Sequence, residues 1–273
     1  MKLTRRVFFS SGHRYWIPAK SEEENRALFS RWASPYNHGH NYTLEVTVEG
    51  DVDAVTGMVV NIKDIDEVLQ RTIVDKFDGK SINDEVDYFQ THSSSTENLL
   101  LYFGQVLTGS STLPKEVTLT KLKLEETPLL YTELTLKPER KMTLTRVYEF
   151  AASHRLHCPG LSDAKNLELF GKCNNPAGHG HNYLLEVSVE GTPDAQTGMM
   201  ADIGAIDAKV NELVVDRYDH KNFNVDIEEF EGRPTTSEVI AQEIFERLKT
   251  NLPAKLHRIR LHETARNIFE VEA

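Results

Sequence analysis

The sequence has only two cysteines, Cys158 and Cys173, and both lie in its second half. Two thiols cannot build a disulfide framework for a chain of 273 residues, so we expect a reducing, cytoplasmic environment. A Cys158–Cys173 disulfide is an alternative that we do not favour. The scarcity of thiols therefore excludes the class of small secreted proteins that disulfides hold together.

The sequence also lacks long apolar runs and any excess of positive charge. No stretch approaches the roughly 20 apolar residues that cross a bilayer, and the first residues lack the apolar core of a signal peptide. With 31 Lys and Arg against 42 Asp and Glu, the formal net charge is −11. We therefore expect neither a membrane nor a nucleic-acid partner. A local basic pocket for a phosphorylated small molecule is still compatible with this charge.

What the sequence does contain is a repeat. Residues 34–42 read SPYNHGHNY and residues 175–183 read NPAGHGHNY, a separation of 141 positions (34 to 175). Several pairs keep the same spacing, among them His13 and His154, Gly57-Met58 and Gly198-Met199, Asp78 and Asp219, and Glu97 and Glu238. We therefore predict two tandem domains, residues 1–138 and 142–273, that arose by duplication. Each is long enough to bury its own core.

Both copies predict the same order of elements. In the first copy, apolar and polar residues alternate over 42–49, as in a half-buried strand, and 62–77 has helical spacing. A loop rich in acidic and small residues is expected before the second strand. Capping boxes (Ser94 to Glu97, Thr235 to Glu238) predict a further helix start in each copy, and two strands follow. The order ββ-α-α-ββ predicts an α+β fold, an antiparallel sheet covered on one face by helices.

Histidines recur at the start of the second predicted strand of each copy. His179 and His181 are two residues apart on a strand and so share a face, and His154 lies on the preceding strand. Three histidines with an open fourth position are typical of a catalytic zinc site. The first copy repeats the set as His13, His38 and His40. A single such pair is usually a surface feature, but recurrence in both copies favours a metal site.

Other candidate residues lie near these histidines in the second copy. Cys173 could be a thiolate base activated by a nearby cation, a small buried apolar residue, or a fourth zinc ligand that makes the site structural. Asp219 and His220 could transfer protons near neutral pH or merely end a helix. Glu263 and its counterpart Glu126 could be solvated, or could accept paired hydrogen bonds from an amidine-like group.

Together these residues resemble the 6-pyruvoyl-tetrahydropterin synthase / 6-carboxy-tetrahydropterin synthase family, in tandem. The motifs ASHRL, LFGKCNNPAGHGHNY, PDAQTGM and DHKN, the Thr-Ser-Glu helix start and the strand-end Glu follow in family order across 148–273. The resemblance implies two tandem tunnelling-fold (T-fold) domains, each a four-stranded antiparallel sheet with two helices on one face. Such domains assemble into rings, so we expect a homo-oligomer, with a trimer of tandem chains forming a pseudo-hexamer as one arrangement.

The resemblance also implies an activity for the second copy. The reaction is the zinc-dependent conversion of 7,8-dihydroneopterin triphosphate to 6-pyruvoyl-tetrahydropterin with triphosphate elimination, catalysed by a carbon–oxygen lyase acting on phosphates in tetrahydrobiopterin biosynthesis. Mg²⁺ could accompany the triphosphate. By position, the zinc ligands would be His154, His179 and His181, the base Cys173, the proton relay Asp219 and His220, and the pterin-binding residues Glu263, Thr236, Ser237 and Glu238. In this family the sites lie between subunits, so the relay pair could serve a neighbouring subunit's cysteine.

The first copy departs from the family pattern at two positions. Trp32 stands where Cys173 does, and Gly79 where His220 does, so we predict a catalytically silent domain that could still hold a second zinc ion. Five residues separate Cys173 from His179, as in pyruvoyl-forming relatives, whereas the carboxy-forming enzymes of the queuosine pathway usually have three. Two alternatives stay open: cleavage of the substrate's side chain, as in a 6-carboxy-tetrahydropterin synthase, and a non-catalytic zinc- or pterin-binding assembly protein.

Overall fold

The computed structural model describes residues 1–109 and 112–273, which form two compact units. The first unit comprises residues 1–145 together with 190–202, and the second comprises 146–189 and 203–273. Residues 190–202 belong by sequence to the second copy, yet they pack with the first unit. No helix in the described ranges is both long and apolar enough to span a membrane.

The first unit contains an antiparallel sheet whose strands alternate buried and exposed residues. Its order is β3-β1-β2-β4-β5, and the short β3 runs parallel to β1. On β2, Leu44, Val46 and Val48 are fully buried, while the residues between them point to the other face. The strands are β1 (Lys2–His13), β2 (His38–Gly50), β3 (Lys80–Ser81), β4 (Val117–Thr127) and β5 (Leu130–Thr135).

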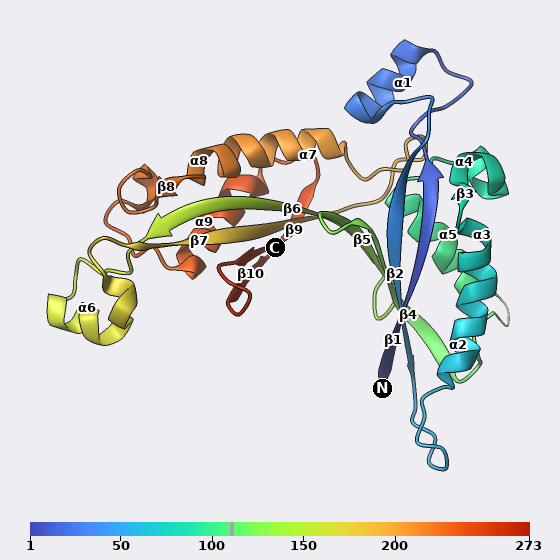
Figure 1. The fold of residues 1–273 in the computed structure, drawn as a ribbon, viewed down its shortest axis with the longest axis horizontal. Coiled ribbons are helices and arrows are strands. Elements are labelled where there is room, and N and C mark those ends of the chain that lie inside the picture. The colour runs from blue at the N-terminus through green and yellow to red at the C-terminus, as the bar shows by residue number, and fades with distance from the viewer. Residues whose placement is uncertain (110–111) are drawn as a thin grey trace. The chain divides into compact units, whose positions relative to one another are not determined.

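Helices cover one face of this sheet (Figure 1). The predicted helix over 62–77 is present as α2 (Ile62–Leu69), a π-helical segment (Gln70–Val74) and α3 (Asp75–Phe77). After α4 (Ile82–Glu85) comes α5 (Thr96–Thr108). Ile65, Phe77 and Phe103 from these helices are fully buried in the same core as the apolar side chains of β2 and β4.

The second unit repeats the arrangement. Its strand order is β10-β9-β7-β6, and the short β8 pairs parallel with β6. Its elements are β6 (Lys141–His154), β7 (His179–Glu190), α7 (Ile203–Val210), a π-helical segment (Asn211–Val215), α8 (Asp216–Tyr218), β8 (Lys221–Asn222), α9 (Ser237–Lys249), β9 (Lys255–His262) and β10 (Ile268–Glu272). The α+β fold with the order ββ-α-α-ββ is thus confirmed in both copies.

The prediction of a loop between the first two strands of each copy is wrong in part, because a helix lies there. These helices, α1 (Glu22–Phe29) and α6 (Asp163–Phe170), lie beyond the ends of the strands (Figure 1). Ser21 and Glu24 form a full capping box at the start of α1, and acidic residues in its first turn favour the helix dipole. Ser162 caps α6. The capping signal was therefore present in a stretch that composition alone assigns to a loop.

The predicted capping boxes at the later helices are wrong by one residue. The N-cap of α5 is Ser95, whose hydroxyl accepts from the amide of Asn98, and the N-cap of α9 is Thr236. Glu97 does not reach back to the cap position that we predicted. Its carboxylate instead accepts a hydrogen bond from the amide of Met200, 2.9 Å away. A long-range contact thus replaces a local one.

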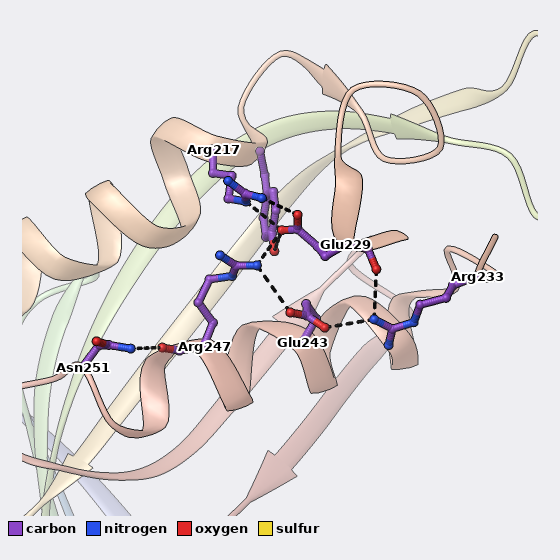
Figure 2. Close-up of polar contacts among 7 residues, drawn as sticks. Arg217, Glu229, Arg233, Glu243, Arg247 and Asn251 are labelled. Carbon is purple, nitrogen blue, oxygen red and sulfur yellow. Dashed lines mark hydrogen bonds and ion pairs between the residues drawn. The ribbon is translucent and has the colours of Figure 1, made fainter. Parts of the chain in front are cut away.

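A partly buried carboxylate ties helices of the second unit together (Figure 2). Glu229 accepts hydrogen bonds from Arg217, from Arg247 (2.7 Å) and from the hydroxyl of Tyr218 (3.0 Å). Burial acts to raise the pKa of Glu229, but these bonds, led by that from Arg217, lower it to about 2. Arg247 lies on α9 and Arg217 on α8, so the network fixes one helix against the other.

Replacing Glu229 with Gln tests this network. The charge-assisted bonds are lost, so we expect the free energy of unfolding at pH 7 to fall by about 2–3 kcal/mol. The pKa of Glu229 is lower in the folded than in the unfolded chain, so its contribution is full above about pH 4.5. As the pH decreases below that value, the contribution to stability decreases, and it is lost near the folded pKa of about 2. Urea unfolding followed by circular dichroism measures the difference at each pH.

The exposed neighbour Glu228 provides the control. Glu228→Gln should change the stability by no more than about 0.5 kcal/mol. Equal losses for the two variants, or a loss at Glu229 that does not depend on pH, would contradict the role of the network.

Candidate functional site

In each unit, two antiparallel strands bring three imidazoles together. In the first unit His13 lies opposite His38 and Ser11 opposite His40, so all three histidine side chains gather on one face. The ring centroids are 4.4 Å apart for His13 and His38, and 5.1 Å apart for the two pairs with His40. The candidate ligand atoms lie within 4.8 Å of one another. This geometry could hold one metal ion.

The second unit has the same cluster at the end of β6 and the start of β7. The centroid of His154 lies 4.7 Å from that of His179 and 5.3 Å from that of His181, with ligand atoms again within 4.8 Å. His154 Nδ1 is 2.7 Å from the carbonyl oxygen of Thr235, so it donates a proton there and leaves Nε2 as a ligand.

The ring nitrogens that face one another have no hydrogen-bond partner within the described residues. In the second unit they are Nε2 of His154 and His181 and Nδ1 of His179, all buried. A buried polar atom without a partner is costly and needs an explanation. A cation bound by the three nitrogens supplies one, so the cluster fits a metal ion.

Burial favours the neutral, metal-binding form of most of these imidazoles. It lowers the pKa of His154 and His181, and in the first unit it lowers the pKa of His13 to about 3 and of His40 to about 4. The neighbouring imidazoles act in the same direction. Neutral imidazole is the form that coordinates a divalent cation.

A carboxylate accompanies each cluster. Glu263 Oε1 lies 3.8 Å from Nε2 of both His154 and His181, and Glu126 lies at similar distances from its own pair of histidines. Ser237 and Asn267 hold Glu263 by hydrogen bonds of 2.6 and 2.9 Å. Burial alone would raise the pKa of Glu263, but these bonds outweigh it and hold the pKa below its usual value. The carboxylate is therefore an ionised acceptor.

The other residues predicted to bind pterin lie at the start of α9. Ser237 is its first residue and contacts Glu263, and Thr236 is the N-cap. Glu238 is exposed. The structure thus brings Ser237 to Glu263 and places Thr236 and Glu238 beside it on the chain.

Asp219 and His220 form the predicted pair. Asp219 accepts from the amide of Ala151 and from Nδ1 of His220, each at 2.7 Å, and these bonds lower the pKa of Asp219. His220 has a φ of 57° and a side chain that is 84% exposed. It lines a cavity of about 640 Å³ together with His181. The equivalent cavity of the first unit, about 730 Å³, has Gly79 in this position.

Cys173 contacts the chain just after His154, whereas Asp219 and His220 contact it just before His154. Cys173 sits in a 3-10 turn (Gly171–Asn174) after α6, and its carbonyl accepts from the amide of Leu156. The relay pair is anchored at Ala151, five residues before Leu156, which corresponds to about 16 Å along an extended chain. Among the described residues, no hydrogen bond joins Cys173 to Asp219 or His220. The predicted base and relay therefore do not meet within one copy.

Asn166 has no motif of its own in the sequence, yet it anchors residues 158–162, the loop ahead of α6, and α6 leads into the Cys173 turn. The side-chain oxygen of Asn166 accepts from the amide of Cys158, and its nitrogen donates to the carbonyls of Cys158, Leu161 and Ser162. Asn25 makes the equivalent bonds in the first copy. The recurrence of this buried asparagine at the repeat spacing was the signal that could have identified it.

Arg155, the residue after His154, holds the other side of the Cys173 turn. Its guanidinium donates to the carbonyl and the side-chain oxygen of Asn174. In the first copy Arg14 instead makes a two-pronged ion pair with Asp84. The equivalent arginines thus contact neutral oxygens in one copy and a carboxylate in the other.

Comparison with known proteins gives a consistent result. The sequence model of the 6-pyruvoyl tetrahydropterin synthase family matches residues 2–136 and again 143–273. The 6-pyruvoyl tetrahydrobiopterin synthase of Drosophila melanogaster is 46% identical over 128 residues, which are 46% of this chain and 76% of that protein. The Homo sapiens protein of the same name is 41% identical over 126 residues, 46% of this chain and 87% of that protein.

Two further relatives extend the comparison. A 6-carboxy-5,6,7,8-tetrahydropterin synthase of Rickettsia conorii is 26% identical over 149 residues, 49% of this chain and 99% of that protein. The solved structure of Caenorhabditis elegans 6-pyruvoyl tetrahydropterin synthase has 42% identity and a TM-score of 0.46, and covers 48% of this chain and 94% of that one. Each relative therefore matches about half of this chain.

Replacing Asn166 with Ala tests whether the loop 158–162, which this side chain holds, supports the Cys173 turn at the other end of α6. Four hydrogen bonds are lost, so we expect the turn to loosen and Cys173 to react several-fold faster with a thiol reagent such as DTNB. The assay uses a Cys158→Ser background, in which Cys173 is the remaining thiol. Asn25→Ala, the matched change in the first copy, should leave the rate unchanged. Equal rates for all three proteins would show that Asn166 does not position the turn.

Proposed function

Because the chain belongs to the 6-pyruvoyl tetrahydropterin synthase family, with two tandem T-fold domains, we propose that its second copy converts 7,8-dihydroneopterin triphosphate to 6-pyruvoyl-tetrahydropterin. Triphosphate is eliminated, so the enzyme is a carbon–oxygen lyase acting on phosphates. The observation that carries the proposal is the cluster of three imidazoles whose facing nitrogens are buried and without a hydrogen-bond partner among the described residues, beside the Glu263 carboxylate. A purely structural role would not leave these three ring nitrogens buried without a hydrogen-bond partner.

His154, His179 and His181 would hold a Zn²⁺ ion. Their spacing, the lowered pKa of His154 and His181, and the bond that fixes the tautomer of His154 all suit this metal. When bound, zinc supplies Lewis-acid polarisation of the substrate's side-chain oxygens, which makes the adjacent C–H groups more acidic. His13, His38 and His40 offer the same arrangement in the first copy, so we assign two zinc ions to each chain.

Glu263 would bind the pterin. An ionised carboxylate held by Ser237 and Asn267 presents oxygens in a fixed position, as paired hydrogen bonds from the amino-pyrimidine edge require. Its place 3.8 Å from two of the zinc-binding nitrogens would set the ring beside the metal site. The substrate's side chain would then extend toward the imidazole cluster.

Cys173 and His220 would move the protons. The carbonyl of Cys173 accepts from the amide of Leu156, two residues after His154, and the amide of His220 donates to the carbonyl of Ala151, three residues before His154. Cys173 and His220 are therefore held on opposite sides of His154 along this part of the chain. We assign to Cys173 the removal of a proton from a carbon atom of the substrate's side chain. To His220, oriented by Asp219, we assign proton transfer at the cavity that it shares with His181. An internal redox reaction of the substrate needs both removal and return of protons.

The first copy would bind metal without turnover. Trp32 replaces the base and carries the guanidinium of Arg31 4.6 Å above its ring. Asp84 neutralises Arg14, which disfavours a triphosphate there, whereas the second copy has Val225 in place of Asp84. Gly79, with a φ of 70°, lacks the imidazole of His220.

Product analysis with 7,8-dihydroneopterin triphosphate and Mg²⁺ tests the activity. Wild type should yield 6-pyruvoyl-tetrahydropterin, and Cys173→Ala should lower kcat by about 10²–10⁴-fold because a general base is lost. Trp32→Ala, the matched change in the first copy, should leave turnover unchanged. A 6-carboxy product would identify the alternative in which the side chain is cleaved, and no pterin product would reject the enzyme. Full activity in Cys173→Ala would overturn the assignment of the base.

Metal analysis tests the two zinc sites independently of turnover. We expect two zinc ions per wild-type chain by plasma mass spectrometry, and one in either His181→Ala or His40→Ala, because each change removes a ligand. Product formation should be lost only in His181→Ala. A single zinc ion in wild type that survives His40→Ala would show that the first copy is not loaded.

A further inference from the structure

A cavity of about 420 Å³ lies in the first unit, and the described residues that line it do not include the clustered histidines. Trp16, Phe29 and Phe89 supply aromatic side chains to its wall. Three carboxamides and a hydroxyl also line it, from Asn83, Gln90, Gln196 and Ser93. This volume, with aromatic side chains and a few polar groups, is typical of a site for a small molecule.

The walls of the cavity are held in place by the protein itself. Phe29 and Phe89 are each 2% exposed. Gln196 belongs to the segment 190–202, which packs with the first unit, and the hydroxyl of Ser95 holds that segment by a bond of 2.6 Å to the carbonyl of Gly198. The site is therefore preformed, so a ligand would have to order little of the chain.

The charged groups at the cavity neutralise each other. The guanidinium of Arg14 donates two hydrogen bonds to the carboxylate of Asp84, 2.7 and 2.6 Å long. These bonds hold the pKa of Asp84 well below its usual value, so the carboxylate is ionised and the pair carries no net charge. A charged ligand would lose hydration without gaining a free counter-charge. The lining therefore favours an uncharged molecule.

The second copy differs at the residues that shape this cavity. Arg233, the counterpart of His92, places its guanidinium 5.8 Å from the ring of Phe230, the counterpart of Phe89. His92 instead stacks on Tyr88, with ring centroids 4.0 Å apart, so no guanidinium takes that place in the first copy. Further differences are His157 for Trp16, Val225 for Asp84 and Pro234 for Ser93. The combination of groups around the cavity is therefore particular to the first copy.

Ser93 contributes a polar group that lacks a partner. Its hydroxyl oxygen is buried and has no hydrogen-bond partner among the described residues, whereas its carbonyl accepts from the side chain of Asn98 at 2.9 Å. A buried hydroxyl in this state is costly and needs an explanation. A ligand in the cavity that Ser93 lines would supply the missing bond.

We propose that this cavity binds an uncharged, planar nitrogen heterocycle, such as a purine or pterin base without phosphate. The aromatic side chains would pack against the faces of the rings. Asn83 and Gln196 each offer a donor and an acceptor, which suit the amide and amino groups at the edge of such a base. The first copy would then be a binding domain. This binding needs neither zinc nor turnover, so it does not rest on the proposed function.

Fluorescence of Trp16 in the whole protein tests the binding. The chain has two tryptophans, so Trp32→Phe leaves Trp16, at the cavity wall, as the remaining one. We expect saturable quenching by guanosine or by neopterin, and the stronger of the two identifies the purine or the pterin as the preferred base. Guanosine 5′-monophosphate should bind at least about tenfold more weakly than guanosine, because its phosphate is charged.

Two cavity variants and two controls locate the site. Ala195 lines the cavity and is exposed, so Ala195→Phe should fill the space and weaken binding at least about tenfold. Ala54→Phe, the matched change in the equivalent loop, should leave the affinity unchanged. Glu126→Gln alters the carboxylate beside the imidazoles and should also leave it unchanged. Circular dichroism checks that each variant is folded.

Ser93→Ala separates a ligand-binding hydroxyl from a structural one. We expect binding about 3–10-fold weaker, while the urea midpoint does not fall, because no hydrogen bond within the protein is lost. A lower midpoint with unchanged binding would overturn the role of this hydroxyl.

The remaining outcomes are decisive in the same way. No saturable quenching by either base, or equal binding by Ala195→Phe and Ala54→Phe, overturns the cavity as a binding site. Loss of binding in Glu126→Gln would place the base beside the imidazoles and also overturn it. Equal affinity for guanosine and its monophosphate overturns the preference for an uncharged ligand. A protein that binds the base in the cavity but forms no pterin product defeats the proposed function alone.

Discussion

The pairing register of the first two strands in each copy is the constraint on which the rest of the structure depends. On β2 the histidines occupy the same alternate positions as Tyr42, Leu44 and Val46, which are buried in the core. The histidine cluster is therefore an extension of the core face beyond the part that the helices cover. A slip of one residue would move the whole apolar set to the opposite face, so burial of the core holds the register and with it the histidines.

Comparison of the two copies separates the residues that maintain the scaffold from those that we propose for proton transfer. Both copies keep the three imidazoles, the nearby carboxylate, and the buried asparagine that anchors the first loop. They differ where a group would transfer a proton: Trp32 faces Cys173, and Gly79 faces His220. His220 tolerates a φ of 57° in a position that glycine fills in the first copy, and its bond to Asp219 supports it there. The scaffold accepts either residue, so the fold does not require the difference between the copies.

Identical residues also have different environments in the two copies. Glu97 is buried, which raises its pKa, and it receives the amide of Met200, whereas Glu238 is exposed. Met199 is buried, whereas Met58 is half exposed. A duplicated protein has two copies of every contact surface but only one connection between its copies. One pair of surfaces is in contact within the molecule, and Met58 and Glu238 of the other pair are exposed.

The sequence by itself determined the duplication, the α+β order of elements, and the histidines that gather on one face. Alternation and helical spacing act over a few residues, and two residues on one strand share a face wherever that strand lies. It did not determine that residues 190–202 pack with the first unit, that Glu97 serves that segment rather than its own helix cap, or that Cys173 and His220 are anchored on opposite sides of His154. Those outcomes depend on surfaces far apart in the sequence that meet only when the protein folds, and no local pattern records which surfaces will meet.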